Sequence, residues 1–407
     1  MSTTQQITGT AVAVSITANT TIYIPFGTAS ILSTISGTEN DQRSFWGNKK
    51  AFVSNLFVNV AVNTVTATST VTLRKNASNT GITVSIGSSA TGFFRDLISR
   101  DEIRPFDRVN YVVVAGATGT NIQITVISTV TNSGKYYATI FSQTTGSNVG
   151  ASVTHYMAFT GRNVLTGTEP NAAFRFFGNG ILQNLTAYIN TNSRSDSTTI
   201  RLVKNAANDN QSLSIASSST GIFEDKINNS NINRTDTACF LTETGAGTGE
   251  INTTIINIFY VTLNNQHFVV RGNLTISAAT TRYLPICGRG DFSSTELNNV
   301  NLMMLKGRNK GSGLFVFVSA NTINGATTFT IRNNQSDTAL TLSIGNSTTG
   351  EFTNSIDQFN FVDDDQLSIA MVAGGTTGSL TKRANSFQGT FAQSNSGSGT
   401  LSTPGIF

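Results

Sequence analysis

Apolar residues occupy every second position in several short stretches of the chain, and this pattern predicts β-strands. A period of two residues is typical of a strand that buries one of its faces. No longer stretch shows the residue spacing of a helix. The alternation is clearest at Leu56, Val58, Val60 and Val62, and it returns late in the chain at Leu314, Val316 and Val318.

Turn-forming residues separate these strands and predict hairpins. Val71 and Leu73 precede an Asn-Ala-Ser-Asn-Thr-Gly turn at residues 76–81, and the alternation resumes at residues 82–86. Strands at intervals of about 8 to 12 residues, joined by Gly, Asn and Ser turns, favour antiparallel sandwiches or jelly rolls over parallel sheets. The predicted fold is therefore all-β.

One segment of the chain occurs three times at a constant spacing. Residues 71–96, 200–225 and 329–354 align without gaps, and the offset is 129 residues in both steps (205 − 76 and 334 − 205). Internal repeats of this length indicate repeated structural units. The recurring residues include Asn76, Asn205 and Asn334; Gly92, Gly221 and Gly350; Phe94, Phe223 and Phe352; and, beyond the segment, Asn63, Asn192 and Asn321, Asp107, Asp236 and Asp365, and Gly116, Gly245 and Gly374.

The repeat predicts three tandem antiparallel β-sandwich domains of jelly-roll type. Their expected limits are residues 1–134, 135–264 and 265–387, and residues 388–407 form a C-terminal arm. A Tyr-containing element upstream of each repeated segment, at Tyr23, Tyr156 and Tyr283, has variable spacing and predicts an adaptable loop after its strand.

The recurring polar and glycine residues have structural interpretations. Each recurring Asp precedes an apolar strand, where its side chain is expected to accept hydrogen bonds from its own turn. A calcium site at Asp363–Asp365 is the alternative, although the other two copies lack companion carboxylates. Each Thr-Gly-x-Phe element predicts an unusual backbone angle at Gly and a Phe that anchors a loop to the core.

Composition argues against an enzyme. Charged residues make up 12% of the chain, and there are two His and two Cys residues, so metal or nucleophile chemistry has few candidate residues. We predict no catalytic residues, no bound metal and no cofactor. The net charge of +4 includes no block of Lys or Arg longer than a pair, which argues against nucleic-acid binding. The absence of a long apolar run or a signal peptide argues against a membrane partner.

Two segments are candidate interaction sites. Residues 100–108 are the densest charged stretch, and their Arg residues are either solvated or part of an ion-pair contact between subunits. The Gly- and Ser-rich C-terminal arm ends in two apolar residues, which predicts that its end docks on a neighbouring subunit, with a disordered end as the alternative. The candidates are Arg100, Arg104, Arg108, Ile406 and Phe407.

The strand at residues 70–76, the following Val-Ser-Ile and the Thr-Gly-x-Phe-x-Asp element resemble the jelly-roll or tumour-necrosis-factor-like domains of virion structural proteins, such as tailed-phage decoration, minor capsid and fibre proteins. The resemblance implies a non-enzymatic virion protein. A capsid decoration or minor capsid protein at joints between capsomers ranks first, with the major capsid protein as partner and a homo-oligomer or pseudo-trimer as assembly. A receptor-binding tail fibre or spike ranks second, and a carbohydrate-binding surface module with a glycan receptor ranks third.

Overall fold

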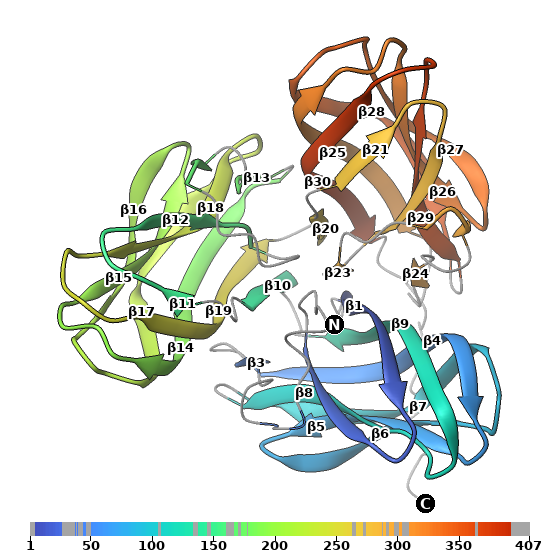
Figure 1. Ribbon diagram of the computed structural model, residues 1–407, viewed down its shortest axis with the longest axis horizontal. Coiled ribbons are helices and arrows are strands. Elements are labelled where there is room, and N and C mark those ends of the chain that lie inside the picture. Colours follow the sequence, from blue (N-terminus) through green and yellow to red (C-terminus); the bar gives the residue numbers. More distant parts are fainter. Residues whose placement is uncertain are drawn as a thin grey trace, which may run out of the picture.

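The structure is a computed structural model of the whole chain (Figure 1). It describes residues 5–26, 37, 39, 44–45, 50–104, 107–132, 137–144, 148–159, 167–169, 172–176, 178–262, 266–271, 274–286, 288–289, 293–296, 301–302, 309–362 and 365–391. Within these ranges the regular structure is β-strand, and no helix is long and apolar enough to cross a membrane.

The first sandwich contains two sheets in jelly-roll order. One sheet has the order β1-β9-β4-β7 and the other β2-β8-β5-β6, and the short strand β3 also pairs with β8. All of these pairs are antiparallel. The strands are β1 (Gln5–Thr17), β2 (Thr21–Pro25), β3 (Ser44–Phe45), β4 (Ala51–Val65), β5 (Ser69–Lys75), β6 (Ser78–Ile86), β7 (Gly92–Ile103), β8 (Arg108–Val114) and β9 (Gly119–Asn132).

The second sandwich has the same strand order. Its sheets are β10-β19-β14-β17 and β12-β18-β15-β16, with β11 beside β19 and β13 beside β18. The strands are β10 (Tyr137–Thr144), β11 (Asn148–Val149), β12 (Thr154–Met157), β13 (Phe174–Arg175), β14 (Gly180–Asn192), β15 (Thr198–Lys204), β16 (Ala207–Ile215), β17 (Gly221–Ile232), β18 (Thr237–Thr244) and β19 (Ile251–Thr262).

The third sandwich again has this order. Its sheets are β20-β30-β25-β28 and β22-β29-β26-β27, and the two-residue strand β23 pairs with β20 in parallel. The all-β prediction of antiparallel sandwiches is confirmed. The strands are β20 (Gln266–Arg271), β21 (Leu274–Ser277), β22 (Thr281–Pro285), β23 (Gly288–Arg289), β24 (Asn301–Leu302), β25 (Asn309–Asn321), β26 (Thr327–Asn333), β27 (Ser336–Ile344), β28 (Gly350–Phe361), β29 (Gln366–Ala373) and β30 (Ser379–Phe391).

The expected C-terminal arm begins inside a strand. Strand β30 continues four residues beyond Phe387 to Phe391, and Gln388 pairs with Ser312 of β25. The arm proper can therefore begin only at Ala392, and residues 392–407 lie outside the described part of the chain.

Each sandwich has its own apolar core between its two sheets. Leu73 and Ile86 are fully buried in the first core, and the residues 129 positions further on, Leu202 and Ile215, are fully buried in the second. Ile331 and Ile344 take these places in the third.

The expected alternation along β4 ends before Val62. Leu56, Val58 and Val60 are buried, whereas Val62 is 42% exposed. The prediction for Val62 was wrong because the register between β4 and β9 shifts between Val60 and Val62, which reverses the facing of the later residues.

The predicted six-residue turn is a two-residue turn. Strand β6 begins at Ser78, and only Asn76 and Ala77 connect it to β5, with φ angles of 50° and 67°. Positive φ at both central residues is the geometry of a type I′ hairpin turn, which matches the twist of the paired strands. Asn205-Ala206 and Asn334-Gln335 form the corresponding turns.

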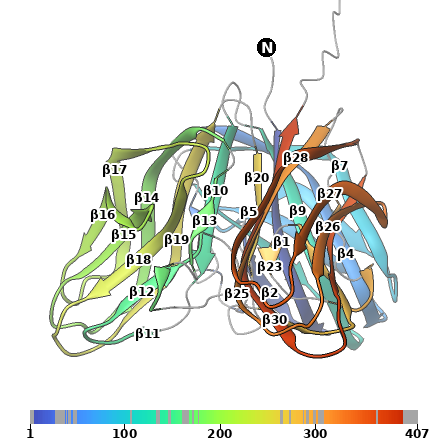
Figure 2. The ribbon, with the colours of Figure 1, turned by 90° about the horizontal axis from the view of Figure 1, so that it is seen from above.

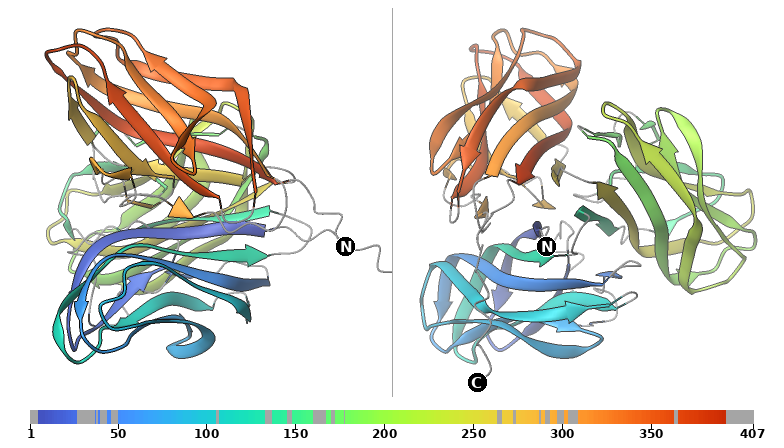
Figure 3. Two further views of the ribbon diagram at one scale, coloured as in Figure 1. Left: turned by 90° about the vertical axis from the view of Figure 1, so that its right-hand side faces the viewer. Right: turned by 180° about the vertical axis from the view of Figure 1, so that it is seen from behind.

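The three sandwiches lie around a common centre. Figure 1 shows the first strands β1, β10 and β20 toward that centre, and Figure 3 shows the same placement from behind. Strand β10 contacts both β1 and β20. The sandwiches also touch away from the centre. Phe259 of β19 is buried in the core cluster of the first sandwich, and Arg175 of β13 donates a 2.5 Å hydrogen bond to Glu351 of β28.

Candidate interaction surface

Strand β7 carries a bulge that pushes residues 97–99 away from its sheet. Leu56 of β4 pairs with Asp96 and Ser54 pairs with Arg100, so three residues of β7 lie opposite the single residue Asn55. Asn55 has a φ of 55°, which bends β4 at the same point. Bulges of this kind re-aim side chains at a sheet edge.

Asp96 holds the bulge in shape. Its Oδ1 accepts hydrogen bonds from the backbone N–H groups of Ile98 (3.1 Å) and Ser99 (3.0 Å), and its Oδ2 accepts one from Thr83 on the opposite sheet (3.0 Å). Burial by itself would raise the pKa of Asp96, but the hydrogen bonds from Ser99, Thr83 and Ile98 outweigh it and the pKa of Asp96 is lowered. The carboxylate therefore fixes the loop and links the two sheets.

Ile98, at the tip of this bulge, is 95% exposed. The other sandwiches repeat the arrangement: Ile227 on β17 is 88% exposed and Ile356 on β28 is 87% exposed. The opposing strand residues with positive φ are Asn184 and Gly313, and the residues that accept hydrogen bonds from the Ile N–H groups are Asp225 and Asn354.

The bulges lie toward the end of the molecule at which the described chain begins and ends. Gln5 at the start of β1 pairs with Asn132, which shares a row with Phe52 and Glu102 across the sheet. The bulge on β7 is a few residues from this row. Phe391, the last described residue, lies at the matching end of the third sandwich. In Figure 2 the labels of β7, β17 and β28 all lie toward one end of the molecule.

The pH dependence of the free energy of unfolding in acid tests the hydrogen bonds of Asp96 and Asp225. The pKa of Asp225 is also lowered, since hydrogen bonds from Asn228, Ser212 and Ile227 outweigh the opposing effect of burial. A carboxyl whose pKa is lower in the folded than in the unfolded state stabilises the fold above its unfolded pKa of about 3.9 and loses this contribution as the pH falls through the folded pKa.

We therefore expect the free energy of unfolding to fall between about pH 5 and pH 2, and the D96N/D225N variant to lose part of this dependence. The third sandwich has Asn354 at this position and serves as the natural precedent for the change. Urea unfolding across this pH range measures both proteins. Parallel pH profiles for the two proteins would contradict the assignment.

The recurring Asn and Asp residues form one hydrogen-bonded pair in each sandwich. Asn76 Nδ2 donates to Asp107 Oδ1 (2.6 Å), Asn76 Oδ1 accepts from the Arg108 N–H (2.9 Å), and Asp107 Oδ2 accepts from the Arg104 N–H (2.8 Å). Each Asp thus bonds within its own turn and to a distant hairpin. The corresponding side-chain pairs are Asn205–Asp236 at 2.8 Å and Asn334–Asp365 at 2.6 Å.

No group of three or more metal-ligating side chains occurs among the described residues. Asp363 and Asp364 of the calcium alternative lie outside the described residues.

The glycines and phenylalanines of the repeat have distinct environments. Gly92, Gly221 and Gly350 have φ angles of 96°, 105° and 109°, a region that favours glycine. Phe94, Phe223 and Phe352 are only partly buried and pack against the core clusters from the edge strands. Each Phe therefore contacts its core from the edge of a sheet, because β7, β17 and β28 are edge strands.

The charged stretch forms ion pairs with other residues of the first sandwich. Glu102 pairs with Lys50 and with Arg104 (2.8 Å), and Asp101 pairs with Lys75 (2.9 Å). The guanidinium of Arg100 lies over the Phe52 ring, 5.6 Å from its centroid. Arg108 contributes its backbone N–H to the Asn76 pair. A contact of Arg100, Arg104 or Arg108 with another subunit stays a prediction.

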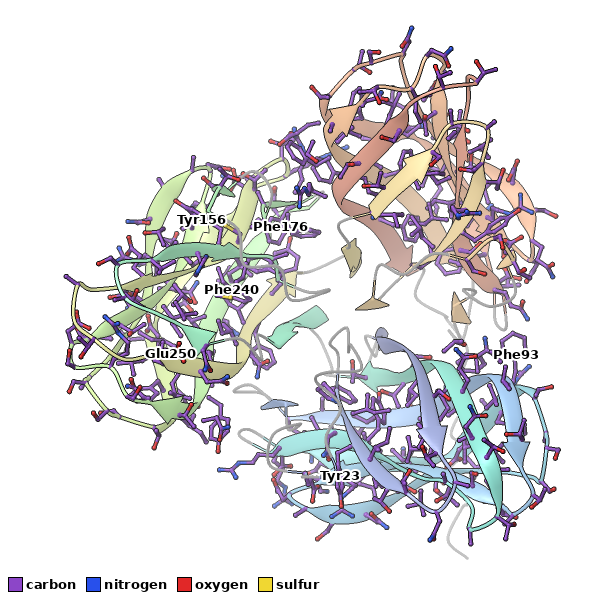
Figure 4. All side chains as sticks on the ribbon, viewed as in Figure 1. Tyr23, Phe93, Tyr156, Phe176, Phe240 and Glu250 are labelled. Atoms are coloured by element: carbon purple, nitrogen blue, oxygen red, sulfur yellow. The ribbon has the colours of Figure 1, made fainter. Side chains whose placement is uncertain are left out.

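In the first and third sandwiches the recurring tyrosine lies beside an Arg–Glu ion pair that the sequence did not predict. Arg74 donates to both carboxylate oxygens of Glu39 (2.8 and 3.0 Å) while its guanidinium lies over the Tyr23 ring, which Figure 4 labels in the first sandwich. In the third sandwich Arg332 donates to one carboxylate oxygen of Glu296 (2.9 Å), and its guanidinium lies over the Tyr283 ring.

In the second sandwich Val203 replaces the Arg of this ion pair. Val203 packs with Ala172, Cys239 and Leu241 near Tyr156. Glu169 instead accepts a hydrogen bond from the Ala206 N–H (3.1 Å). Burial raises the pKa of Glu169, and this hydrogen bond offsets only part of the effect.

Ile98, Ile227 and Ile356 also escaped the sequence reasoning. A signal was available, since the three residues are separated by the 129-residue offset and follow the repeated segment by two positions. Exposure, however, could not be read from an apolar residue inside a strand pattern. Ile406 and Phe407, the predicted docking residues of the arm, lie outside the described residues.

No protein-family model matches the chain, and no curated protein matches it. Among solved structures, the chain is similar to one described as "The Triple Jelly Roll Fold and Turret Assembly in an Archaeal Virus", with 14% sequence identity, a TM-score of 0.20 and coverage of 96% of this chain and 90% of that chain. A TM-score of 0.20 is too low to support a functional argument. The jelly-roll assignment rests on the strand order itself.

Proposed function

We propose that the protein is a non-enzymatic structural component of a virus particle, and more narrowly a capsid decoration or minor capsid protein that stabilises joints between capsomers. One observation carries this proposal: three jelly-roll sandwiches of the same strand order lie around a common centre, with the corresponding strands β1, β10 and β20 innermost (Figure 1). A single chain built in this way presents corresponding surfaces three times, in the arrangement that a trimer of identical subunits has.

One contact between sandwiches involves a position whose counterpart in the first sandwich also lies toward a neighbouring sandwich, which supports the comparison with a trimer. Glu351 at the start of β28 faces Arg175 of the second sandwich. The corresponding residue of the first sandwich is Phe93, whose ring stacks on Phe57 (centroids 5.4 Å apart) and which Figure 4 places on the side toward the third sandwich. Repeating one heterologous contact is how a ring closes.

A pseudo-trimer fits a threefold or quasi-threefold position of an icosahedral shell, where three neighbours meet. The low charge of the chain favours apolar and Asn or Thr contacts with the major capsid protein, so binding is expected to depend only weakly on salt. Residues 392–407, ending in Ile406 and Phe407, would add an arm that docks on a neighbouring subunit. Deletion of these 16 residues without any change in assembly would dispose of the arm and leave the rest of the proposal standing.

Imaging of particles with and without this protein tests the function. We expect density for the chain at joints between capsomers, and a shell that ruptures at lower temperature when the chain is missing. Density confined to the tail tip would favour a receptor-binding fibre or spike. Specific retention on a glycan array, without any binding to particles, would favour a carbohydrate-binding module.

A further inference from the structure

The three bulge residues Ile98, Ile227 and Ile356, here called the isoleucine tips, are the most exposed large apolar side chains among the described residues. The next is Leu97, at 51%. A nearly fully exposed isoleucine contributes little to the core, and three at corresponding positions form a pattern rather than a scatter of surface residues.

The backbone beneath each tip is held rigid. Asp225 accepts hydrogen bonds from Ile227 N–H (3.2 Å), Asn228 N–H (3.0 Å) and Ser212 N–H of the opposite sheet (3.1 Å). Asn354 accepts from Ile356 and Asp357 (both 3.1 Å) and donates to Thr341 O of the opposite sheet (2.7 Å). A side chain presented on a fixed backbone loses less conformational entropy on binding, which favours recognition.

The charges beside the tips differ between the sandwiches. Arg100 follows the first tip, Lys226 and Glu224 form an ion pair beside the second (2.7 Å), and Asp357 follows the third. No charged partner can complement all three surroundings equally. The chemistry that the three sites share is a protruding isoleucine, and its complement is an uncharged apolar socket.

We propose that the isoleucine tips insert into three identical apolar sockets, one on each of three copies of the same partner subunit arranged around a threefold position. The partner is a threefold arrangement because the tips lie on corresponding bulges of the three sandwiches, and the sandwiches lie around one centre (Figure 1). This inference rests on the proposed function and specifies the surface through which it acts.

Binding of variants to purified particles that lack this chain tests the proposal. Each of I98T, I227T and I356T keeps a β-branched residue in the strand and removes the apolar tip. Each variant is expected to bind about tenfold more weakly, because threonine keeps only part of the apolar area that the isoleucine would bury. The triple variant is expected to bind about a thousandfold more weakly when the tips act independently.

The control is V62T/V114T/V372T, which changes three exposed valines outside the bulges, each 42–43% exposed. This control is expected to bind like the wild type. Circular dichroism and thermal unfolding establish that each variant is folded, because exposed substitutions should leave both nearly unchanged.

The outcomes separate the two proposals. Failure of the wild-type chain to bind particles overturns the proposed function. Binding by the wild type and the triple variant with equal affinity overturns the isoleucine tips alone. A loss confined to one single variant overturns the threefold arrangement. A change in the oligomeric state of the free chain on triple substitution would identify a second copy of this chain as the occupant and overturn the partner assignment.

Discussion

Replacement of Arg194 by Ala is expected to destabilise the second sandwich by about 3 kcal/mol, at the lower end of the range for breaking a buried ion pair. The Arg194 side chain is completely buried and donates to the carbonyls of Gly249 (2.9 Å) and Gly245 (2.7 Å) and to Asp196 (2.5 Å). Its loss leaves a cavity and two carbonyl groups without their donor. Asp196 is partly exposed, so water can solvate its carboxylate, which keeps the loss from being larger.

The other two sandwiches supply a matched control. The residues corresponding to Arg194 are Val65 and Ile323, both fully buried, and the first sandwich has Ala67 where the second has Asp196. The double variant R194V/D196A gives the second sandwich the same two apolar residues that the first sandwich has at these positions. We expect its stability to lie within about 1 kcal/mol of the wild type, because replacing a buried pair by packed apolar residues is often neutral.

Hydrogen exchange resolved along the chain is the suitable measurement, since three sandwiches need not unfold together. Faster exchange should be confined to the second sandwich in R194A. Equal exchange in R194A and R194V/D196A would show that the ion pair has no special role, and exchange unchanged from the wild type in R194A would contradict the expected destabilisation itself.

The sequence predicted those features that depend on residues close together in the chain. Alternation at Leu56, Val58 and Val60 identified a strand with a buried face, and the spacing of turn residues identified antiparallel sheets. The exposure of Val62 depends on a register shift between β4 and β9. The alternation of apolar residues cannot predict this long-range pairing. Arg194 lies in a polar Asn-Ser-Arg-Ser-Asp stretch typical of a surface loop, yet two of its three hydrogen-bond acceptors lie in a loop more than 50 residues away.

The candidate surface was less predictable than the fold for the same reason. The recurrence of Asn76 and Asp107 showed that both positions matter, but the hydrogen bond between them joins residues 31 positions apart. The bulge at Ile98 lies opposite Asn55, which has a positive φ. An Asn within an apolar strand does not by itself predict that backbone angle. Backbone pairing had to be known before the exposed tip could be recognised.

The second large effect is expected at Asn63, where each polar atom of the side chain has a backbone partner. Asn63 is largely buried; Nδ2 donates to Gly87 O (3.1 Å) and Ala90 O (3.0 Å), and Oδ1 accepts from the Val65 N–H (3.0 Å). The side chain thus connects the end of β4 to the loop between β6 and β7. The corresponding residues Asn192 and Asn321 make the same three hydrogen bonds.

Asn63→Ala is expected to lower the free energy of unfolding of the first sandwich by about 3 kcal/mol, because three backbone groups lose partners and each costs about 1–3 kcal/mol when it stays buried. Asn63→Asp is the sharper control: it keeps the acceptor for Val65 but replaces the donor by a carboxylate beside two carbonyl oxygens. We expect it to be at least as destabilising at pH 7 and to recover partly near pH 3, where a protonated carboxyl can donate. Hydrogen exchange of β4, β6 and β7 measures both variants, with N192A and N321A as parallel tests in the other sandwiches. A change below about 0.5 kcal/mol in Asn63→Ala, the range of ordinary surface substitutions, would show that these hydrogen bonds do not hold the loop.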